Sequence, residues 1–328
     1  MQLVRLALLA VLASGSVLGL SACSTPDTPE PSASSPTDAV RTFTDDLGRT
    51  VTLPPIRRIV SLAPNLTEIA FAAGAGARIV AVGRSDDYPP AVDTLPHVSV
   101  LPVDVEAIVA HEPDLVLATT QVNSARDADT FGAVSIPSYY FSFPTLQSVF
   151  DAIRRMGELA GTPEAARDSA ASLEEAFARI QARTDSILAS KDSPTPESVP
   201  RPSVLVLAGS DVLYSFGASS YVQTMVEAAG GQSVTRSLQN AAPTLSEEFV
   251  LRSKPDVIVG AFGTDSPART LLSNHPSFDI VPAIETGRVY NIDSDLLFRP
   301  GPRLVSGTDA LSRLLFPDVF SPERQGAP

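Results

Sequence analysis

Val105 to Ala118 reads VEAIVAHEPDLVLA, and Glu247 to Gly260 reads EEFVLRSKPDVIVG. Both stretches predict a short helix, a Pro-Asp turn and a continuously apolar strand. A strand without polar alternation is typical of a parallel sheet that is covered on both faces. The repeat therefore predicts two similar α/β lobes. Three pairs of residues match at one constant separation: Glu106 with Glu248, Pro113 with Pro255, and Asp114 with Asp256.

The first lobe begins with a strand from Arg58 to Leu62, which Pro64 ends. Asn65 or Thr67 is expected to cap the helix that follows and runs to Ala73. The glycines of Gly74-Ala75-Gly76 then stop that helix ahead of the next strand, at 78–82. A Gly-x-Gly before a strand is the reverse of a dinucleotide-binding fingerprint. A further strand is expected at 134–141 and a further helix at 146–159.

One long helix is expected between the lobes, from Pro163 to about Ser190, because it has no internal proline or glycine. Its apolar positions follow helical spacing: Ala166, Ala170, Leu173, Phe177, Ile180, Ile187 and Leu188. A second-lobe strand follows at 203–208. The predicted organisation is an N-terminal α/β lobe at 40–161, a connecting helix at 162–190, a loop at 191–202, a C-terminal α/β lobe at 203–318 and a tail at 319–328.

Two α/β lobes joined by one rigid helix predict a ligand cleft between them. Ligands in such sheets bind beyond the carboxyl ends of the strands, so the loops that follow strands should line the cleft. These loops are 64–66, 86–90, 119–123, 214–221, Gly263 and 295–299.

The N-terminus has the plan of a secretory signal, with Arg5 ahead of an apolar run that is too short to span a bilayer. The run ends in Leu20-Ser21-Ala22-Cys23, which resembles the lipobox of bacterial lipoproteins. The resemblance implies cleavage after residue 22 and acylation of Cys23, the single cysteine of the chain. The alternative is an ordinary signal peptide that happens to contain a cysteine. Residues 23–39, rich in Pro, Ser and Thr, predict a flexible linker from the anchor.

The formal charge of −13 and the pI near 4.6 argue against nucleic acid as a partner, because phosphate binding needs clustered lysine and arginine. They also argue against contact with anionic lipid other than through the anchor. We expect a monomer outside the cytoplasm, tethered to the membrane on its periplasmic or outer face.

No catalytic constellation is recognisable, and we expect neither an enzyme nor a cofactor. The folded part has no Gly-x-Ser-x-Gly elbow and no thiol once Cys23 is acylated. His97, His111 and His275 lack ligand-type neighbours and are expected at the surface, so no metal site is predicted. Asp86 and Asp87 are adjacent and should point apart, which suits a turn or a polar rim better than a catalytic pair.

The order of these motifs resembles the helical-backbone class of ABC-transporter substrate-binding proteins, over about Phe43 to Phe316. The matching words include RRIVSLAPNLTEIAFAAG, VGRSDDYPP and LYSFGASSYVQTMVEAAGG, together with the two copies of the repeat. This class captures cobalamin, ferric siderophores or haem, and it delivers the ligand to a permease dimer with ATPase subunits. A ligand-sensing signalling lipoprotein and a lipid-anchored enzyme are the alternatives from other classes.

Within the class, the loops 85–90 and 294–303 are similar to those of cobalamin-binding members, where Asp295 would be the family aspartate. A corrinoid is therefore the expected ligand, with a siderophore or haem as alternatives. Tryptophans that would stack on a corrin are absent, and Leu101 stands where one would fall. The expected ligand-binding residues are Pro64, Asn65, Asp86, Asp87, Tyr88, Leu101, Gln121, Asn123, Tyr214, Phe216, Gly217, Tyr221, Asp295 and Arg299.

The resemblance also assigns a role to the glutamates of the repeat. In this class one glutamate on each lobe docks against arginines of the permease, and Glu106 and Glu248 match those positions. Each is alternatively an ordinary acidic residue at a helix start, where the helix dipole favours it by about 0.3–1 kcal/mol.

Overall fold

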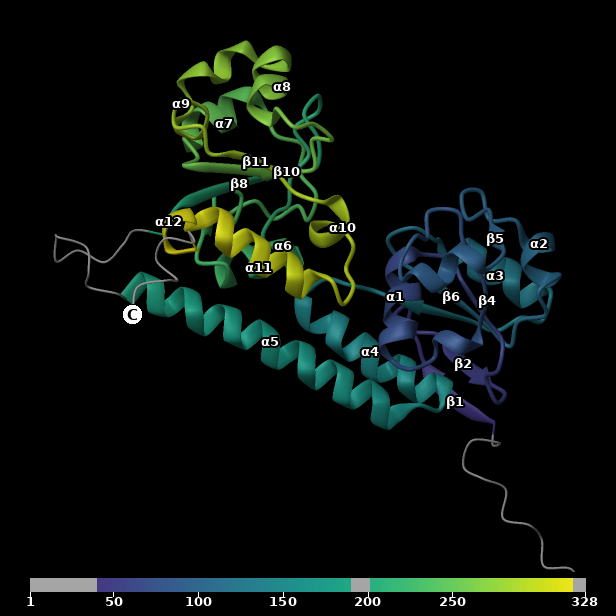
Figure 1. Cartoon of the computed structure of the whole chain (residues 1–328). Coiled ribbons are helices and arrows are strands. Elements are labelled where there is room, and N and C mark those ends of the chain that lie inside the picture. The colour runs from purple at the N-terminus through teal and green to yellow at the C-terminus, as the bar shows by residue number, and fades with distance from the viewer. Residues whose placement is uncertain (1–39, 190–200, 321–328) are drawn as a thin grey trace, which may run out of the picture. The chain divides into compact units, whose positions relative to one another are not determined.

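The computed structural model describes residues 40–189 and 201–320, which form two α/β lobes and the helix α5 (Pro163–Ala189) between them (Figure 1). The predicted signal peptide, the linker with Cys23, nearly all of the loop at 191–202 and most of the tail lie outside the described residues. Among the helices that are described, none is long and apolar enough to cross a membrane.

The first lobe is built on a five-stranded parallel sheet in the order β5-β4-β3-β6-β7. Its strands are β3 (Ile59–Ser61), β4 (Ile79–Gly83), β5 (His97–Val98), β6 (Leu115–Thr119) and β7 (Ser138–Phe141). An antiparallel hairpin of β1 (Arg41–Thr44) and β2 (Thr50–Leu53) precedes the sheet. The helices are α1 (Pro64–Ala72), η2 (Gly76–Arg78), η3 (Pro90–Thr94), α2 (Val105–Val109), α3 (Ala125–Ala133) and α4 (Leu146–Ala160).

The second lobe has a four-stranded parallel sheet in the order β11-β10-β8-β9. Its strands are β8 (Ser203–Leu207), β9 (Gln232–Ser233), β10 (Val257–Gly260) and β11 (Val289–Asn291). The helices are α6 (Tyr221–Ala228), α7 (Glu247–Ser253), α8 (Pro267–Asn274), η4 (Pro276–Ile280), α9 (Pro282–Glu285), α10 (Ser294–Leu297), α11 (Leu304–Leu315) and α12 (Pro317–Phe320). The predicted α/β class is confirmed.

The two copies of the repeat fold alike, as α2 followed by β6 and as α7 followed by β10. Asp104 caps α2 by accepting from the backbone N–H of Ala107 at 3.0 Å, and Ser246 caps α7 by accepting from Phe249 at 3.2 Å. These caps satisfy backbone donors that a helix start otherwise leaves unpaired. Every residue of β6 and β10 is buried, as expected for strands covered on both faces.

The turn between helix and strand is also the same in both copies. Glu112 and Lys254, each directly before the proline, adopt left-handed backbone conformations with φ of 46° and 44°. The aspartate after that proline then binds the start of the neighbouring strand. Asp114 accepts from the backbone N–H of Arg58 at 2.9 Å, and Asp256 accepts from that of Ser203 at 2.8 Å.

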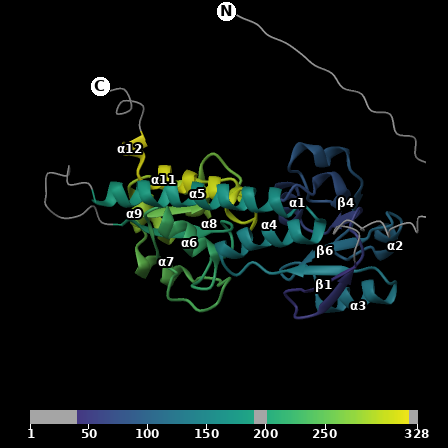
Figure 2. The ribbon, with the colours of Figure 1, turned by 90° about the horizontal axis from the view of Figure 1, so that it is seen from below.

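Helix α5 is continuous over 27 residues and packs on α4 of the first lobe and on α11 of the second (Figures 1 and 2). Near the first lobe the contact is so close that a Cβ added at Gly157 of α4 would lie 2.2 Å from the Cβ of Ala166. Near the second lobe, Arg183 pairs with Asp309 of α11 at 2.5 Å, and the buried Thr184 donates to the carbonyl of Ala228 at 2.7 Å. The connector is therefore attached to both lobes by side-chain packing.

Two local expectations were wrong. No side chain caps α1: it begins at Pro64, so Asn65 lies inside the first turn, and the Thr67 hydroxyl is bonded to Asp86. The strand expected from residue 134 begins only at Ser138. Residue 134 ends α3 instead, and Ser135 takes a left-handed conformation with φ of 60° that no strand accommodates.

Candidate functional site

The candidate site is a group of charged side chains where α1 and the β4–η3 loop of the first lobe meet the α10–α11 segment of the second. The contacts across this boundary join residues that are more than 200 positions apart in the chain. All three segments follow the carboxyl ends of strands, namely β3, β4 and β11. This is the edge of the sheets at which open α/β folds bind ligands.

Glu68 and Arg303 form the buried centre of the group. The Glu68 carboxylate, whose side chain is 2% exposed, accepts from Nε and Nη2 of Arg303 at 3.0 and 2.7 Å. This two-pronged geometry matches the guanidinium fork to the carboxylate. Gly301 lies directly against the pair, and a Cβ there would be 3.3 Å from the Glu68 carboxylate.

Arg299 extends the group toward solvent. Its guanidinium contacts Asp87 of the first lobe at 2.5 Å and Asp295 of its own lobe at 3.0 Å. Arg303 also reaches Asp295, at 3.3 Å. The group thus holds three carboxylates and two guanidinium groups, and each arginine contacts at least two of the carboxylates.

Burial and pairing set the charge states of these carboxyls. Burial raises the pKa of Glu68 above its usual value, and the hydrogen bond and charge of Arg303 oppose that rise. The hydrogen bond from Arg299 instead lowers the pKa of the exposed Asp87. Burial and the arginine therefore act in opposite directions on the pKa of the central carboxyl.

Asp86 lies behind this group, with a side chain turned inward, while its neighbour Asp87 is exposed. One carboxylate oxygen accepts from the Thr67 hydroxyl of α1, and the other is buried without a hydrogen-bond partner. Burial raises the pKa of Asp86 to about 6, although the Thr67 hydrogen bond and Arg299 oppose the shift. The neighbours point apart as expected, and Asp86 binds α1 rather than forming a rim.

Aromatic rings flank the charged group on both lobes. The guanidinium of Arg303 lies 4.5 Å from the centre of the Tyr88 ring, in cation–π contact. On the second lobe, Phe216 and Phe298 stack with ring centres 5.0 Å apart. Asn65 adds a polar contact between the lobes, with its amide donating to the carbonyl of Pro300 at 3.3 Å.

The structure thus brings together six of the residues expected from the sequence: Asn65, Asp86, Asp87, Tyr88, Asp295 and Arg299. Phe216 stacks on Phe298, the residue before Arg299, and Pro64 begins the helix that carries Asn65. Two central members, Glu68 and Arg303, were not among the expected residues. The sequence did contain a signal for Glu68, because it is the one charged residue in the mostly apolar α1. A buried charge needs a partner, so its position predicts an ion pair.

Other expected residues have no direct contact with this group. Leu101 and Tyr214 are exposed in loops, at 71% and 52%, and Gln121 is exposed after β6. The buried Asn123 accepts from the backbone N–H of Thr119 at 3.4 Å, and its amide nitrogen lacks a partner.

Two further expected residues are packed inside the second lobe. The Tyr221 ring belongs to the hydrophobic core and is 8% exposed, so it offers no open face for stacking. Gly217 lies against the backbone of the 238–240 segment, where a Cβ would approach the carbonyl oxygen of Asn240 to 1.9 Å. Glycine at this position therefore serves close packing.

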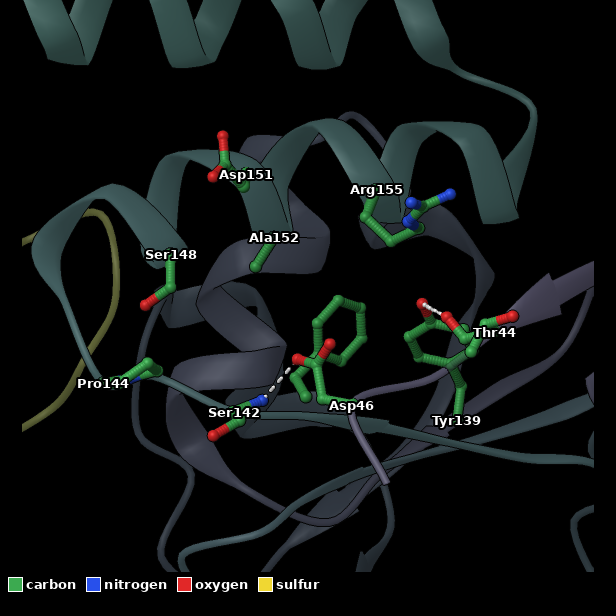
Figure 3. A pocket seen from close by; sticks show the side chains of 10 residues that line it. Thr44, Asp46, Tyr139, Ser142, Pro144, Ser148, Asp151, Ala152 and Arg155 are labelled. Atoms are coloured by element: carbon green, nitrogen blue, oxygen red, sulfur yellow. Dashed lines mark hydrogen bonds between the residues drawn. The ribbon is translucent and has the colours of Figure 1, made fainter. Parts of the chain in front are cut away.

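A hollow of about 440 Å³ lies elsewhere in the first lobe, between β1, β7 and α4 (Figure 3). Tyr139 and Phe141 supply its apolar lining, and Tyr139 donates to the carbonyl of Thr44 at 2.8 Å. None of the residues expected to bind ligand lines it. We regard the charged group as the site, because both lobes and three strand ends contribute to it.

Residues 59–296 match the family model described as periplasmic binding protein. The match spans more than half of the chain, from β3 to α10, and includes both lobes and the connector. The chain belongs to the periplasmic binding protein family.

Two relatives and one solved structure show which proteins this binding protein is similar to. The uncharacterized ABC transporter substrate-binding lipoprotein YvrC of Bacillus subtilis (strain 168) is 28% identical, over 80% of this chain and 81% of the relative. The vitamin B12-binding protein of Pectobacterium atrosepticum is 28% identical over 76% of this chain and 85% of its own. The solved structure of the periplasmic heme-binding protein RhuT from Roseiflexus sp. RS-1 aligns with a TM-score of 0.69 and 27% identity, covering 80% and 98% of the two chains.

This binding protein is accordingly an extracytoplasmic substrate-binding protein of an ABC importer, with two parallel-sheet lobes joined by a long helix. Its family consists of transport receptors rather than enzymes. Among the described residues, no three His, Cys, Asp or Glu side chains gather in a way that could hold a metal ion. The expectation of a surface position holds for His97, which is exposed, but it was wrong for His275, which is 8% exposed.

The two glutamates of the repeat lie at equivalent places on this binding protein. Glu106 and Glu248 are both exposed, and each is the second residue of its helix, α2 or α7. Glu248 pairs weakly with Arg252 of the same helix, at 3.5 Å. Neither belongs to the charged group between the lobes.

Proposed function

We propose that this binding protein captures a corrinoid between its lobes and delivers it, as a monomer, to an ABC permease dimer with its ATPase subunits. The observation that carries the ligand assignment is the pairing of the charged group. Both of its arginines are bound to carboxylates, and carboxylates outnumber arginines. The polar rim is therefore rich in hydrogen-bond acceptors.

A corrinoid suits such a rim because amide groups, which are N–H donors, surround its macrocycle. Asp87 and Asp295 could accept from them, and Phe216 or Tyr88 could contact the flat face of the ring. The 28% identity to a vitamin B12-binding protein over most of both chains supports the same ligand class. Asn65 and Arg299 complete the proposed contact set on the two lobes.

Haem is the second candidate, favoured by the 27% identity to a heme-binding protein and by the exposed phenols of Tyr88 and Tyr214. Tyrosine is a known haem-iron ligand. Haem carries two propionates, however, and these need cations that are not already paired. The same requirement applies to siderophores with anionic groups.

The test is a thermal-shift and calorimetric comparison of cyanocobalamin, dicyanocobinamide, hemin and a ferric hydroxamate siderophore. A ligand at 100 times its Kd should add about 2.7 kcal/mol to the free energy of unfolding. We expect this gain with the two corrinoids, and we expect Asp295→Asn to weaken it. Stabilisation by hemin or the siderophore alone would reject the corrinoid assignment.

We also propose that Glu106 and Glu248 dock the two lobes on matching basic patches of the permease. Losing one partner of a charge pair that is buried on docking costs about 2–5 kcal/mol. The double variant Glu106→Ala/Glu248→Ala should therefore bind ligand normally and fail in reconstituted uptake. Glu164→Ala, at the exposed start of α5, is the matched control. Normal uptake by the double variant would assign both glutamates to helix stabilisation alone.

The lipid anchor at Cys23 remains a proposal from the sequence, supported by the relative that is named a lipoprotein. Cys23→Ser should abolish acylation without changing the fold, because the anchor precedes the described residues. Metabolic labelling with palmitate measures this directly. Wild-type protein without label would contradict the proposal.

A further inference from the structure

His275 occupies an enclosed position between three segments of the second lobe. It follows α8 directly and stacks on Phe278 of η4, with ring centres 5.0 Å apart. Its Nδ1 lies 2.8 Å from a carboxylate oxygen of Glu247, the first residue of α7. Its Nε2 lies 3.0 Å from the backbone carbonyl oxygen of Ser210, in the loop after β8.

Both ring nitrogens of His275 therefore face hydrogen-bond acceptors. A neutral imidazole has one N–H and can donate to one of them, whereas an imidazolium donates to both. A buried ring nitrogen left facing a carbonyl without a proton would lose its hydrogen bond and repel that oxygen. The surroundings accordingly match the doubly protonated ring.

The groups around the ring add negative rather than positive charge. Glu247 also accepts from the Ser277 hydroxyl at 2.6 Å, and the hydrogen bonds from Ser277 and His275 lower the pKa of its carboxyl. Asp211, in the same loop as Ser210, accepts from Asn274 of α8 at 2.6 Å. No described lysine or arginine is paired with Glu247 or Asp211.

His275 thereby binds the residue next to the proposed docking glutamate. Glu247, whose side chain is 46% exposed, accepts hydrogen bonds from His275 and Ser277, while the side chain of Glu248 is 85% exposed. The first lobe has no such arrangement, because Val105 of α2 stands where α7 has Glu247. Val105 instead packs against an apolar cluster.

We propose that His275 is a positioning residue that, in its doubly protonated form, fixes the start of α7 and so the orientation of Glu248. The permease-facing surface of the second lobe then loosens when the ring loses one of its two protons, and that of the first lobe does not. The anchor is also lost once Glu247 is protonated. The role of Glu248 in this scheme rests on the proposed docking function.

The first experiment needs no permease. Imidazole ¹⁵N spectra of the full chain, assigned with His275→Gln, report how many ring nitrogens carry protons, and amide exchange of α7 is followed over the same pH range. We expect two protonated nitrogens at the acidic end of this range and about a ten-fold loss of α7 protection once the ring loses one proton. Protection of α2 should stay constant. The proposal would be overturned if the ring carried one proton at every pH. It would also be overturned if the protection of α7 did not change when the ring loses a proton.

The variants separate positioning from general stability. Glu247→Ala and His275→Gln should each give α7 protection that no longer varies with pH, while His111→Gln, beside α2, should behave as wild type. If His275→Gln does not fold, Glu247→Ala supplies the same comparison, because it removes the acceptor on α7 and keeps the imidazole. A pH response that persists in the variant that folds would contradict the proposal.

The second experiment measures docking on the permease complex in nanodiscs at several pH values. Wild-type affinity should fall as pH rises, and His275→Gln should flatten that profile. Wild-type affinity that stays constant while α7 loosens would reject the link between α7 and docking. If docking is insensitive to Glu248→Ala, the docking function itself fails, while the spectra still decide the role of His275.

Discussion

The two copies of the helix–turn–strand unit share a backbone design and differ in what anchors the helix. Both have a side-chain cap, a left-handed residue before proline and an aspartate that binds the neighbouring strand. In the first lobe α2 begins with Val105 against apolar neighbours, whereas in the second α7 begins with Glu247 bound to His275. Features that close the turn are the same in both copies, and features that meet other elements have diverged.

The lobes differ most where they meet. The first lobe supplies the buried Glu68, and the second supplies Arg303, which pairs with it. Arg303→Ala should lower the free energy of unfolding by about 3–5 kcal/mol, since it removes the hydrogen-bonded partner of the buried Glu68 and leaves only Arg299, at 3.8 Å. Arg299→Ala is the matched control, because its shortest ion pair is with Asp87, whose side chain is 59% exposed, and such pairs contribute about 0–1 kcal/mol. Urea denaturation measures both. Equal losses of unfolding free energy in the two variants would show that burial of Glu68 does not increase the cost of removing its partner.

A second difference is the buried Asp86 behind the charged group, since no acidic residue among those described in the second lobe is buried. Its pKa is raised to about 6, so the folded state binds this proton more tightly than the unfolded chain does. Stability is therefore lost as pH rises from about 4 to 6 and stays lost above that range. Asp86→Asn should recover up to about 3 kcal/mol at pH 7.5 and nearly none at pH 4. A gain that does not vary with pH would contradict this origin.

The aspartates after the prolines test whether the copies are energetically equivalent. Asp114→Ala and Asp256→Ala each remove a carboxylate that accepts hydrogen bonds from backbone N–H groups at the start of a strand, at 2.8–2.9 Å. We expect similar losses of about 2 kcal/mol from both, by chemical denaturation. A loss in one lobe alone would limit the equivalence to geometry.

The left-handed residues before the prolines give the smallest expected effect. Glu112→Gly and Lys254→Gly relieve a conformation that side chains disfavour, while they add freedom to the unfolded chain. The net gain should be about 0.5 kcal/mol at each site, visible as a small rise in Tm. Opposite signs in the two lobes would mean that the neighbouring side chains decide the cost.

Much of this fold could be predicted because it depends on local patterns. Apolar strands after Pro-Asp turns, and a connector without glycine or internal proline, each predict their structure from nearby residues. The start of α1 could not be inferred in this way. The Thr67 hydroxyl can either cap the helix or bind Asp86. The sequence is compatible with both, and in the folded chain the hydroxyl binds Asp86.

The site was partly predictable for the same reason. Loops after strands identified Asn65, Asp87, Asp295 and Arg299, because sheet topology places such loops at one edge. Glu68 lies on α1 and Arg303 directly precedes α11, 235 positions away in the chain, so their pairing depends on how the lobes meet. His275 was misjudged because its partners come from two other segments.

The connector between the lobes also bears on how the importer distinguishes loaded from empty receptors. A helix of 27 residues spans about 40 Å, and α5 has no loop within it to absorb a hinge motion. The separation of Glu106 and Glu248 should then be nearly the same with and without ligand. Empty receptors would occupy the permease as readily as loaded ones, so an excess of ligand-free protein should act as a competitive inhibitor of uptake. Recognition of cargo would then take place after docking, within the permease.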